Sequence, residues 1–313
     1  MSQIIDTIAA HYNFEREKLT RMSEGFQNQV FKIEGKILRV SPRQRRTLSM
    51  IEAELTWLQY LRNNGILLGA PTQIEGFNHV EEITLENQCY YAVFFEEVKG
   101  NPVDVMNPEQ WNSNFYQEWG RVVGRLHALS QSGPQRLCRP RWTNNNIEIL
   151  ELKPNLDGSF LEKYQKLLCN LNSYAPTKEA YGLIHNDLHQ GNFHVISGKP
   201  VLFDFDDCAY NWFAYDVAVS LYHACWQQAA FNGDLLTNFP NQFLSSFLEG
   251  YEKENQFTDT LIQQIPIFLK IRDIFLYNLF KKEWDPNYMQ EWQSEKLREL
   301  EFNILSESCF IQL

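Results

Sequence analysis

The sequence predicts an α+β protein in which strands dominate the N-terminal third and helices dominate the rest. The most β-prone run of the chain, residues 90–95, lies in that first third, together with the other strand patterns. Beyond residue 214, apolar side chains recur at helical spacing almost to the C-terminus. The chain has 313 residues and 44% apolar content, which suffices for two lobes and a sizeable core.

The N-terminal part is expected to combine a sheet with covering helices. Apolar residues at three- and four-residue steps predict the helices, and β-prone runs between turn residues predict the strands. Gly25 falls in the turn of the first hairpin. The expected elements are a helix within 1–20, a hairpin over 24–33, a strand over 36–40, a helix over 45–63, and strands over 81–86 and 89–98.

The C-terminal part is expected to be helical, with one short hairpin embedded in it. Ser197 and Gly198 form a fair turn between the strands of this hairpin, at 195–196 and 201–203. Three prolines and three consecutive asparagines in residues 132–158 predict a long surface connection. The expected helices cover 111–131, 159–174, 214–230, 238–254, 258–283 and 288–306.

Charge and cysteine usage exclude several classes of function. The net charge of −11 disfavours a nucleic-acid partner and an anionic membrane surface. The six cysteines form no C-x-x-C pair, so a zinc site is not expected. The sequence shows no secretory signal pattern and no apolar run of membrane-spanning length, so we expect a cytoplasmic protein without a membrane partner.

The polar residues around the C-terminal hairpin, between Asp187 and Asp204, indicate a type of reaction. Asp187 precedes the C-terminal hairpin, Asn192 opens it, and Asp204 closes it. Because the end of a hairpin's second strand lies beside the start of its first, Asn192 and Asp204 can direct their oxygens to one point. An acid that can accept a proton, with an amide and a carboxylate as hard oxygen ligands, suits magnesium-assisted phosphoryl transfer. The alternative, a solvated polar loop, does not account for this spacing.

The same stretch keeps the order of the protein-kinase catalytic loop, H-x-D-x-x-x-x-N followed by D-F-D, with Asn186 in place of Arg and Asp206 in place of Gly. The runs H-N-D-L-H-Q-G-N, F-D-F-D-D-C-A-Y and Y-D-V-A resemble the aminoglycoside phosphotransferase and choline kinase superfamily. Within it they look most similar to the bacterial homoserine kinase-like and stress-response kinase-like branch.

This resemblance implies a bilobal protein-kinase-like fold that binds ATP and Mg²⁺. The small N-terminal nucleotide-binding lobe would span 1–95, the hinge 96–100, and the helical lobe with the acceptor site 101–313. Family resemblance implies Asp187 as the catalytic base, and Asn192 and Asp204 as magnesium ligands.

The resemblance also implies residues for ATP binding in the first lobe. Gly25, Asn28 and Val30 match the family's nucleotide loop, G-x-x-N-x-V, although one glycine instead of three predicts a lighter grip on phosphate. In the hinge, the carbonyl of Glu96 and the amide of Val98 would meet the adenine edge.

A cation on the 36–40 strand is expected to hold the nucleotide phosphates. Arg39, in an L-R-V context as in many small-molecule members of the family, is the candidate, and its fork suits bidentate phosphate contact. Glu54 lies next to the apolar stripe of the following helix and is the expected partner of Arg39. Glu52 is the competing partner, and Lys36 or Lys32 would take the role of the cation if Arg39 does not.

The leading hypothesis is therefore a kinase that transfers the γ-phosphate of ATP to a hydroxyl of a small molecule, either an antibiotic or a metabolite. The alternatives are a protein Ser/Thr kinase of the stress-response type and a non-catalytic nucleotide-binding protein. The absence of A-P-E after Asp204 disfavours the first alternative. Asp216 and His127 are expected to be structural. Asp273, beside Arg272 in an apolar helix, either forms a buried ion pair or faces the substrate.

Overall fold

The computed structural model describes residues 2–22, 28–85, 88–134, 136–142, 158–232, 238–311 and 313. These residues form an α+β fold, as predicted, that divides into two compact units. The first unit comprises Met1–Gly100, Gly133–Arg139 and Val201–Asp206. The second comprises Asn101–Ser132, Pro140–Pro200 and Asp207–Leu313.

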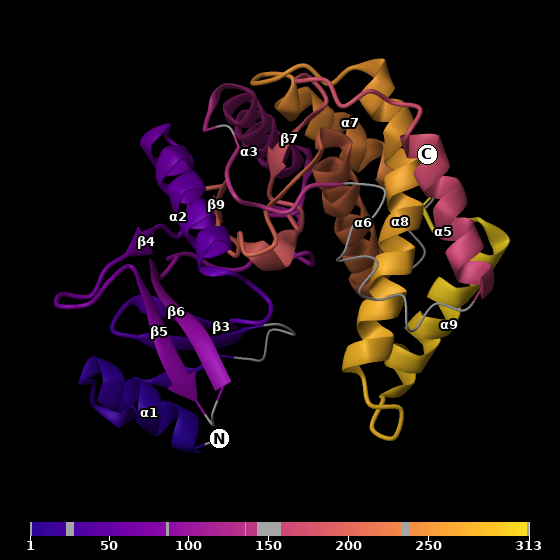
Figure 1. The fold of residues 1–313 in the computed structure, drawn as a ribbon. Coiled ribbons are helices and arrows are strands. Elements are labelled where there is room, and N and C mark those ends of the chain that lie inside the picture. The colour runs from indigo at the N-terminus through magenta and orange to yellow at the C-terminus, as the bar shows by residue number, and fades with distance from the viewer. Residues whose placement is uncertain are drawn as a thin grey trace. The chain divides into compact units, whose positions relative to one another are not determined.

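The first unit contains a six-stranded antiparallel sheet in the order β1-β2-β3-β6-β4, with β5 also paired to β6 (Figure 1). Two helices, α1 (Ser2–Tyr12) and α2 (Leu48–Asn63), accompany it. The strands are β1 (Thr20–Arg21), β2 (Gln29–Ile33), β3 (Lys36–Pro42), β4 (Pro71–Thr72), β5 (Val80–Leu85) and β6 (Gln88–Glu96).

Helix α1 lies within the predicted range 1–20, as expected, and ends at Tyr12. Asn13 adopts a left-handed backbone conformation (φ 56°), and the Phe14 N–H donates to the carbonyl of Ala9 at 2.8 Å. This six-to-one bond past a left-handed residue is a Schellman motif, which ends a helix. One 3₁₀ turn, Arg16–Lys18, then leads into β1.

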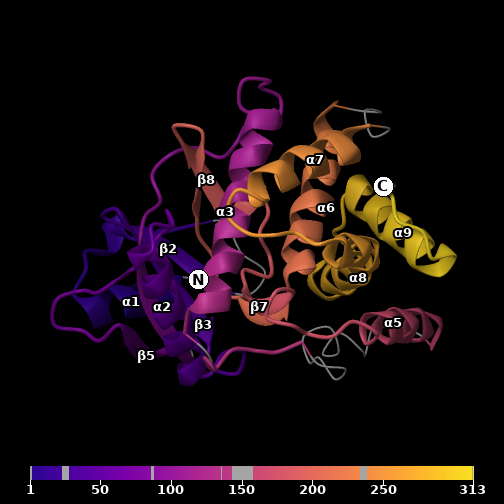
Figure 2. The same ribbon diagram turned by 90° about the horizontal axis from the view of Figure 1, so that it is seen from above.

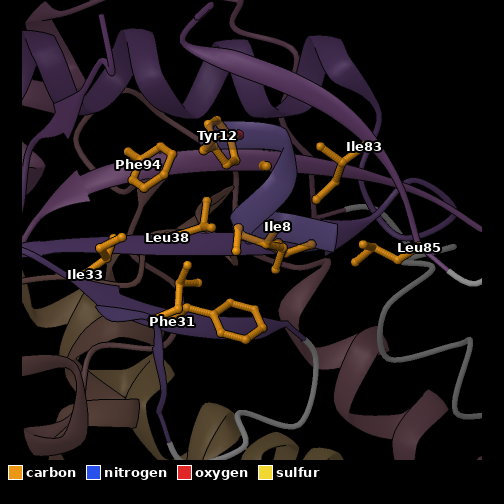
Figure 3. Close-up of a cluster of buried hydrophobic side chains, with 12 residues drawn as sticks. Ile8, Tyr12, Phe31, Ile33, Leu38, Ile83, Leu85 and Phe94 are labelled. Carbon is orange, nitrogen blue, oxygen red and sulfur yellow. The ribbon is translucent and has the colours of Figure 1, made fainter. Parts of the chain in front are cut away.

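Side-chain alternation along the strands gives the sheet two buried faces. Ala92 and Phe94 of β6 join Ile8 and Tyr12 of α1 in one cluster (Figure 3). Tyr91 and Val93 point to the other face and pack with Ile51 of α2. Successive residues of a strand face opposite sides, so each apolar residue of β6 contributes to one of the two faces.

The same alternation decides where the charged residue of β3 points. Leu38 and Val40 belong to the cluster that contains α1. Arg39, between them, therefore faces the α2 side of the sheet. Helix α2 begins after Thr47, whose hydroxyl accepts the N–H of Met50 at 3.3 Å as an N-cap.

The second unit is mainly helical (Figure 2). Helix α8 packs against both α6 and α9, and α3 packs against α7. The helices are α3 (Ser113–Ser132), α5 (Gly158–Leu171), α6 (Phe213–Asn232), α7 (Phe239–Tyr251), α8 (Asp259–Glu283) and α9 (Glu291–Ser306). Every helix predicted for this part is present, within three residues at each end. The predicted surface connection lies largely in 143–157, outside the described residues.

Four short strands frame the polar stretch. β7 (Tyr181–Ile184) pairs antiparallel with β10 (Ala209–Trp212), and β8 (Phe193–Ile196) pairs with β9 (Lys199–Leu202). The predicted turn between β8 and β9 is present, with positive φ at Ser197 (50°) and Gly198 (77°), as a type I′ hairpin turn requires.

Helices α3 and α7 approach each other through glycines. A Cβ atom on Gly250 of α7 would lie 1.8 Å from the carbonyl oxygen of Gln117 in α3, and one on Gly120 would lie 1.8 Å from the carbonyl oxygen of Phe247. Because the obstructing atoms are backbone, a side chain at either position forces the two helices apart.

We expect Gly250→Ala to destabilise the protein by about 3 kcal/mol, the upper end of the usual cost of overpacking. Urea denaturation followed by circular dichroism measures this. The control is Gly158→Ala, because a Cβ there would meet no atom within 4 Å. Equal stability of the two variants would mean that the contact between α3 and α7 adapts without cost.

Candidate active site

The loop after β7 is fixed by one buried carboxylate. The backbone N–H groups of His185 and Asn186 donate to the two oxygens of Asp216 at 3.0 and 2.7 Å. Asp216 is fully buried in the first turn of α6, where the helix dipole favours a negative charge. His127 is also fully buried, and its Nε2 lies 3.3 Å from Asp216 while its Nδ1 lies 2.9 Å from the hydroxyl of Tyr251. Both residues thus have the structural roles that were expected of them.

Asp187 follows this fixed segment and lies in a cationic setting. Its Oδ1 accepts a hydrogen bond from Nη2 of Arg272 at 2.6 Å, and its Oδ2 lies 3.5 Å from Nε2 of His189. Burial raises the pKa of Asp187, but the positive charge of Arg272, with a smaller contribution from His189, outweighs it and holds the pKa well below the usual range. Asp187 is therefore ionised throughout the physiological range.

Asn192 is oriented by the same residue. Its Nδ2 donates to the backbone carbonyl of Asp187 at 2.8 Å and lies 3.4 Å from Oδ2 of Asp187. The 3₁₀ turn Gln190–Asn192 that carries it is capped by His189, whose Nδ1 accepts the N–H of Gly191 at 3.0 Å. Because the amide nitrogen is used as a donor, the oxygen Oδ1 is the atom left to act as a metal ligand.

In the first unit, Arg39 and Glu54 form the expected pair. Two parallel hydrogen bonds of 2.8 and 2.7 Å join them, and both side chains are buried. Burial raises the pKa of Glu54, but Arg39 opposes it more strongly together with neighbouring arginines, so the pKa is lowered and the carboxylate stays ionised. Glu52, the competing candidate, is exposed. The guanidinium of Arg39 also lies 5.0 Å from the ring centroid of Phe95.

Asp206, whose role the sequence left open, lies among arginines of the first unit. It is 2% exposed, and its carboxylate bonds Arg45 and lies 3.4 Å from Nε of Arg46. Nδ2 of Asn28 donates to the same carboxylate at 2.9 Å, and the backbone carbonyl of Asp206 accepts from Arg139. These contacts could not be predicted from local sequence, because Arg45 and Arg46 lie 161 and 160 residues away in the chain.

The remaining predicted residues are placed as follows. Gly25 lies outside the described residues. Asp204, in the first unit, has a left-handed backbone (φ 60°), a conformation that concentrates at functional sites. Val30 lies in β2 opposite Arg39. Glu96 ends β6, and its N–H donates to the carbonyl of Ala70 at 2.8 Å. The contacts of its carbonyl and of the Val98 amide with adenine stay predictions.

The sequence did not predict the partners of Arg272 and Asp273, two adjacent residues of α8. Asp273 does not pair with Arg272. It accepts a hydrogen bond from the hydroxyl of Tyr222 at 2.6 Å, and burial raises its pKa to about 7. Arg272 instead reaches Asp187. The two residues are adjacent, so their side chains leave a helix about 100° apart, and only the packing of α8 decides which one faces the loop.

We expect Asp206→Ala to destabilise the protein by about 3–5 kcal/mol, because it removes the buried carboxylate that bonds Arg45 and lies beside Arg46. Urea denaturation measures this. The control is Glu82→Ala, which removes an exposed bridge to Arg43 (3.1 Å) and should cost at most about 1 kcal/mol. If Asp206→Ala is as stable as the control but loses metal-dependent nucleotide binding, Asp206 is a metal ligand and its arginine contacts are dispensable.

Comparison with known proteins places the chain in a family. Residues 18–251 match the phosphotransferase enzyme family, which is more than half of the chain. The amicoumacin kinase of Bacillus subtilis (strain 168) is 28% identical over 306 residues, covering 94% of this chain and 89% of that protein.

Solved structures agree with the family match. An amicoumacin kinase in complex with AMP-PNP, Ca²⁺ and Ami superposes with a TM-score of 0.88 at 27% identity, over 99% of this chain and 94% of that one. A microcompartment-associated aminopropanol kinase shares the fold with a TM-score of 0.74 at 20% identity, over 96% and 95% of the two chains. The likeness to the nucleotide-bound and metal-bound structure supports binding of an ATP-type nucleotide and a divalent metal ion. The chain belongs to the phosphotransferase enzyme family and is a small-molecule phosphotransferase.

Proposed function

We propose that this protein transfers the γ-phosphoryl group of ATP to a hydroxyl of a small molecule, with Asp187 as the residue that orients this hydroxyl and accepts its proton. The observation that carries the proposal is the setting of Asp187. Its carboxylate is ionised, held on a loop anchored by Asp216, and 26% exposed. A base for phosphoryl transfer has to present an ionised carboxylate at a fixed position.

The donor set fits magnesium as the divalent ion. Oδ1 of Asn192 and the carboxylate of Asp204 would hold it, and the bound ion would supply positive charge at the phosphate oxygens. Among the residues that the structure describes, no group of three or more His, Cys, Asp or Glu side chains is arranged for a metal ion. A ligand pair of one amide and one carboxylate forms no such group, and it suits Mg²⁺, which takes few protein ligands.

The first unit would serve ATP. Arg39, held by Glu54, would provide the charge for the phosphates, with Gly25, Asn28 and Val30 as the other predicted nucleotide-binding residues. Residues 96–100 would be the hinge, with Glu96 and Val98 at the adenine, between lobes at 1–95 and 101–313. Nδ2 of Asn28 donates to Asp206 at 2.9 Å, which supports a place for Asn28 beside the D-F-D segment.

The acceptor belongs to the antibiotics or to the hydroxylated metabolites. Two of the proteins to which the chain is similar are named as kinases of amicoumacin and of aminopropanol. The net charge of −11 is compatible with a cationic acceptor of this kind. A protein acceptor is disfavoured because no A-P-E sequence follows Asp204. Ionised Asp187 in a fixed loop disfavours a purely nucleotide-binding role. No helix in the described part of the chain could span a membrane.

We expect Asp187→Asn to abolish phosphoryl transfer while ATP still binds. Loss of general-base catalysis should lower turnover at least 10²-fold. Purified protein is first screened with ATP and Mg²⁺ against amicoumacin, aminopropanol, aminoglycosides, macrolides, choline, homoserine and generic protein substrates. The variant is then compared on the best acceptor, with ATP affinity from calorimetry. Near-normal turnover of the variant would exclude Asp187 as the base, and transfer to protein alone would exclude a small-molecule acceptor.

We expect Arg39→Ala to weaken ATP about 10- to 150-fold and adenosine much less, because only ATP presents phosphates to the guanidinium. A charge-assisted hydrogen bond contributes roughly 1.5–3 kcal/mol, which corresponds to this change in affinity. Arg39→Lys should recover part of the loss, and Glu54→Gln should show a milder defect of the same kind.

Calorimetry of both ligands across the three variants distinguishes the interpretations. A uniform loss for ATP and adenosine would show damage to the first unit. No loss in Arg39→Ala would assign the phosphate contact to Lys36 or Lys32.

A further inference from the structure

Arg272 of α8 makes two contacts through a single nitrogen. Its Nη2 donates to Oδ1 of Asp187 at 2.6 Å and to Nε2 of His223 at 2.7 Å. The arginine is 3% exposed, and its guanidinium lies 4.8 Å from the ring centroid of Phe275 and beside the hydroxyl of Tyr215. These neighbours fix the guanidinium in one place, so it holds Asp187 from one direction only.

We propose that Arg272 is the positioning residue of Asp187: it holds Oδ1 so that Oδ2 is the oxygen that meets the acceptor hydroxyl. This inference rests on the proposed role of Asp187 in phosphoryl transfer. In this arrangement, Oδ1 of Asp187 keeps the carboxylate in position and Oδ2 contacts the substrate.

The two oxygens differ in how firmly they are bound. Oδ1 has a charge-assisted hydrogen bond of 2.6 Å from the buried Arg272. Oδ2 has two neighbours at longer range, Nδ2 of Asn192 at 3.4 Å and Nε2 of His189 at 3.5 Å. An incoming hydroxyl can bond Oδ2 without competing with a strong contact, whereas at Oδ1 it would have to share the oxygen with Arg272.

His223 supports this arrangement from behind the arginine. It lies in α6, and burial, with the nearby positive charge of Arg272, lowers its pKa well below the usual value. A neutral ring whose Nε2 accepts from Arg272 carries its proton on Nδ1. His223 therefore binds the guanidinium without competing for its charge, and Asp187 is the carboxylate that Arg272 neutralises.

A purely structural role is the competing explanation, since the same ion pair also ties α8 to the loop after β7. The two explanations differ in what depends on Asp187. A positioning residue acts through the Asp187 carboxylate and loses its effect on turnover when that carboxylate is absent. A structural residue affects stability and ATP affinity, whatever residue stands at position 187.

The test is a double-mutant cycle on the full chain with an acceptor found in the screen. Arg272→Met should lower kcat about 10²-fold, as expected for a misplaced catalytic group, with KM for ATP changed less than about twofold. Arg272→Lys should recover part of kcat, because an ammonium can replace one hydrogen bond. In the Asp187→Asn background, Arg272→Met should lower the residual rate by less than about threefold.

The control is Lys282→Met, which removes a cation with 63% side-chain exposure from the same helix and should leave all parameters unchanged. If the losses from Arg272→Met and Asp187→Asn multiply, or ATP affinity falls in parallel with kcat, the positioning role is wrong. Should Arg272→Met not fold, Arg272→Lys decides: full turnover without the guanidinium, or an equal defect in the Asp187→Asn background, overturns the proposal.

The failure of this inference is distinguishable from failure of the proposed function. Wild-type turnover in Asp187→Asn alone would reject Asp187 as the base, and the assignment of Arg272 would fall with it. An inactive Asp187→Asn together with a fully active Arg272→Met would leave the proposed function intact and reject only the role of Arg272.

Discussion

The pairing of buried or partly buried carboxylates with arginines is the constraint on which both compact units depend. Glu54 is paired with Arg39, Asp206 with Arg45 and Arg46, and Asp187 with Arg272. A carboxylate in a low-dielectric interior is costly unless an opposite charge and hydrogen bonds accompany it. The geometry of each pair therefore has to be held by the packing around it, and that packing fixes the side chains in advance of any ligand.

This fixation suits the chemistry of phosphoryl transfer. The reaction needs little covalent participation from the protein, so most catalysis comes from placing charges and reacting groups. A carboxylate kept ionised by Arg272 accepts a proton weakly, but its charge and direction are constant. Such a group orients a hydroxyl well and completes proton transfer only as the new bond to phosphorus forms.

Asp216 illustrates how the fold supports the site from a distance along the chain. It binds no ligand in the proposed scheme, yet it accepts two backbone N–H groups from the segment just before Asp187. Asn186, in that segment, has a positive φ of 72°. Its side-chain oxygen accepts a hydrogen bond from Nδ2 of Asn211 at 3.0 Å. Non-glycine residues adopt this conformation only where their surroundings determine it.

The sequence by itself determined the elements of the fold and the family motifs. Periodicity of 3.6 residues identified the helices, because an amphipathic or buried helix repeats its apolar side chains at that spacing. The H-x-D-x-x-x-x-N spacing marked Asp187 and Asn192, since the loop and turn that carry them are local in the chain. The pair of Arg39 and Glu54 could also be predicted from the sequence, because strand alternation and the apolar stripe of one helix place both residues on the same side of the sheet.

Only the tertiary structure decided which charged residues meet across long separations. Arg272 and Asp273 are adjacent charged residues of one apolar helix, and the sequence does not indicate the partner of either. The packing of α8 places Arg272 at Asp187 and Asp273 at Tyr222. Asp206 likewise has partners on the β3–α2 segment that no local pattern indicates. Such contacts depend on the rotation of each helix and on the path of each loop in three dimensions. Hydrophobic periodicity indicates only which face of an element a residue occupies. The packed core then selects one arrangement of the elements, and with it the contacts between charged residues.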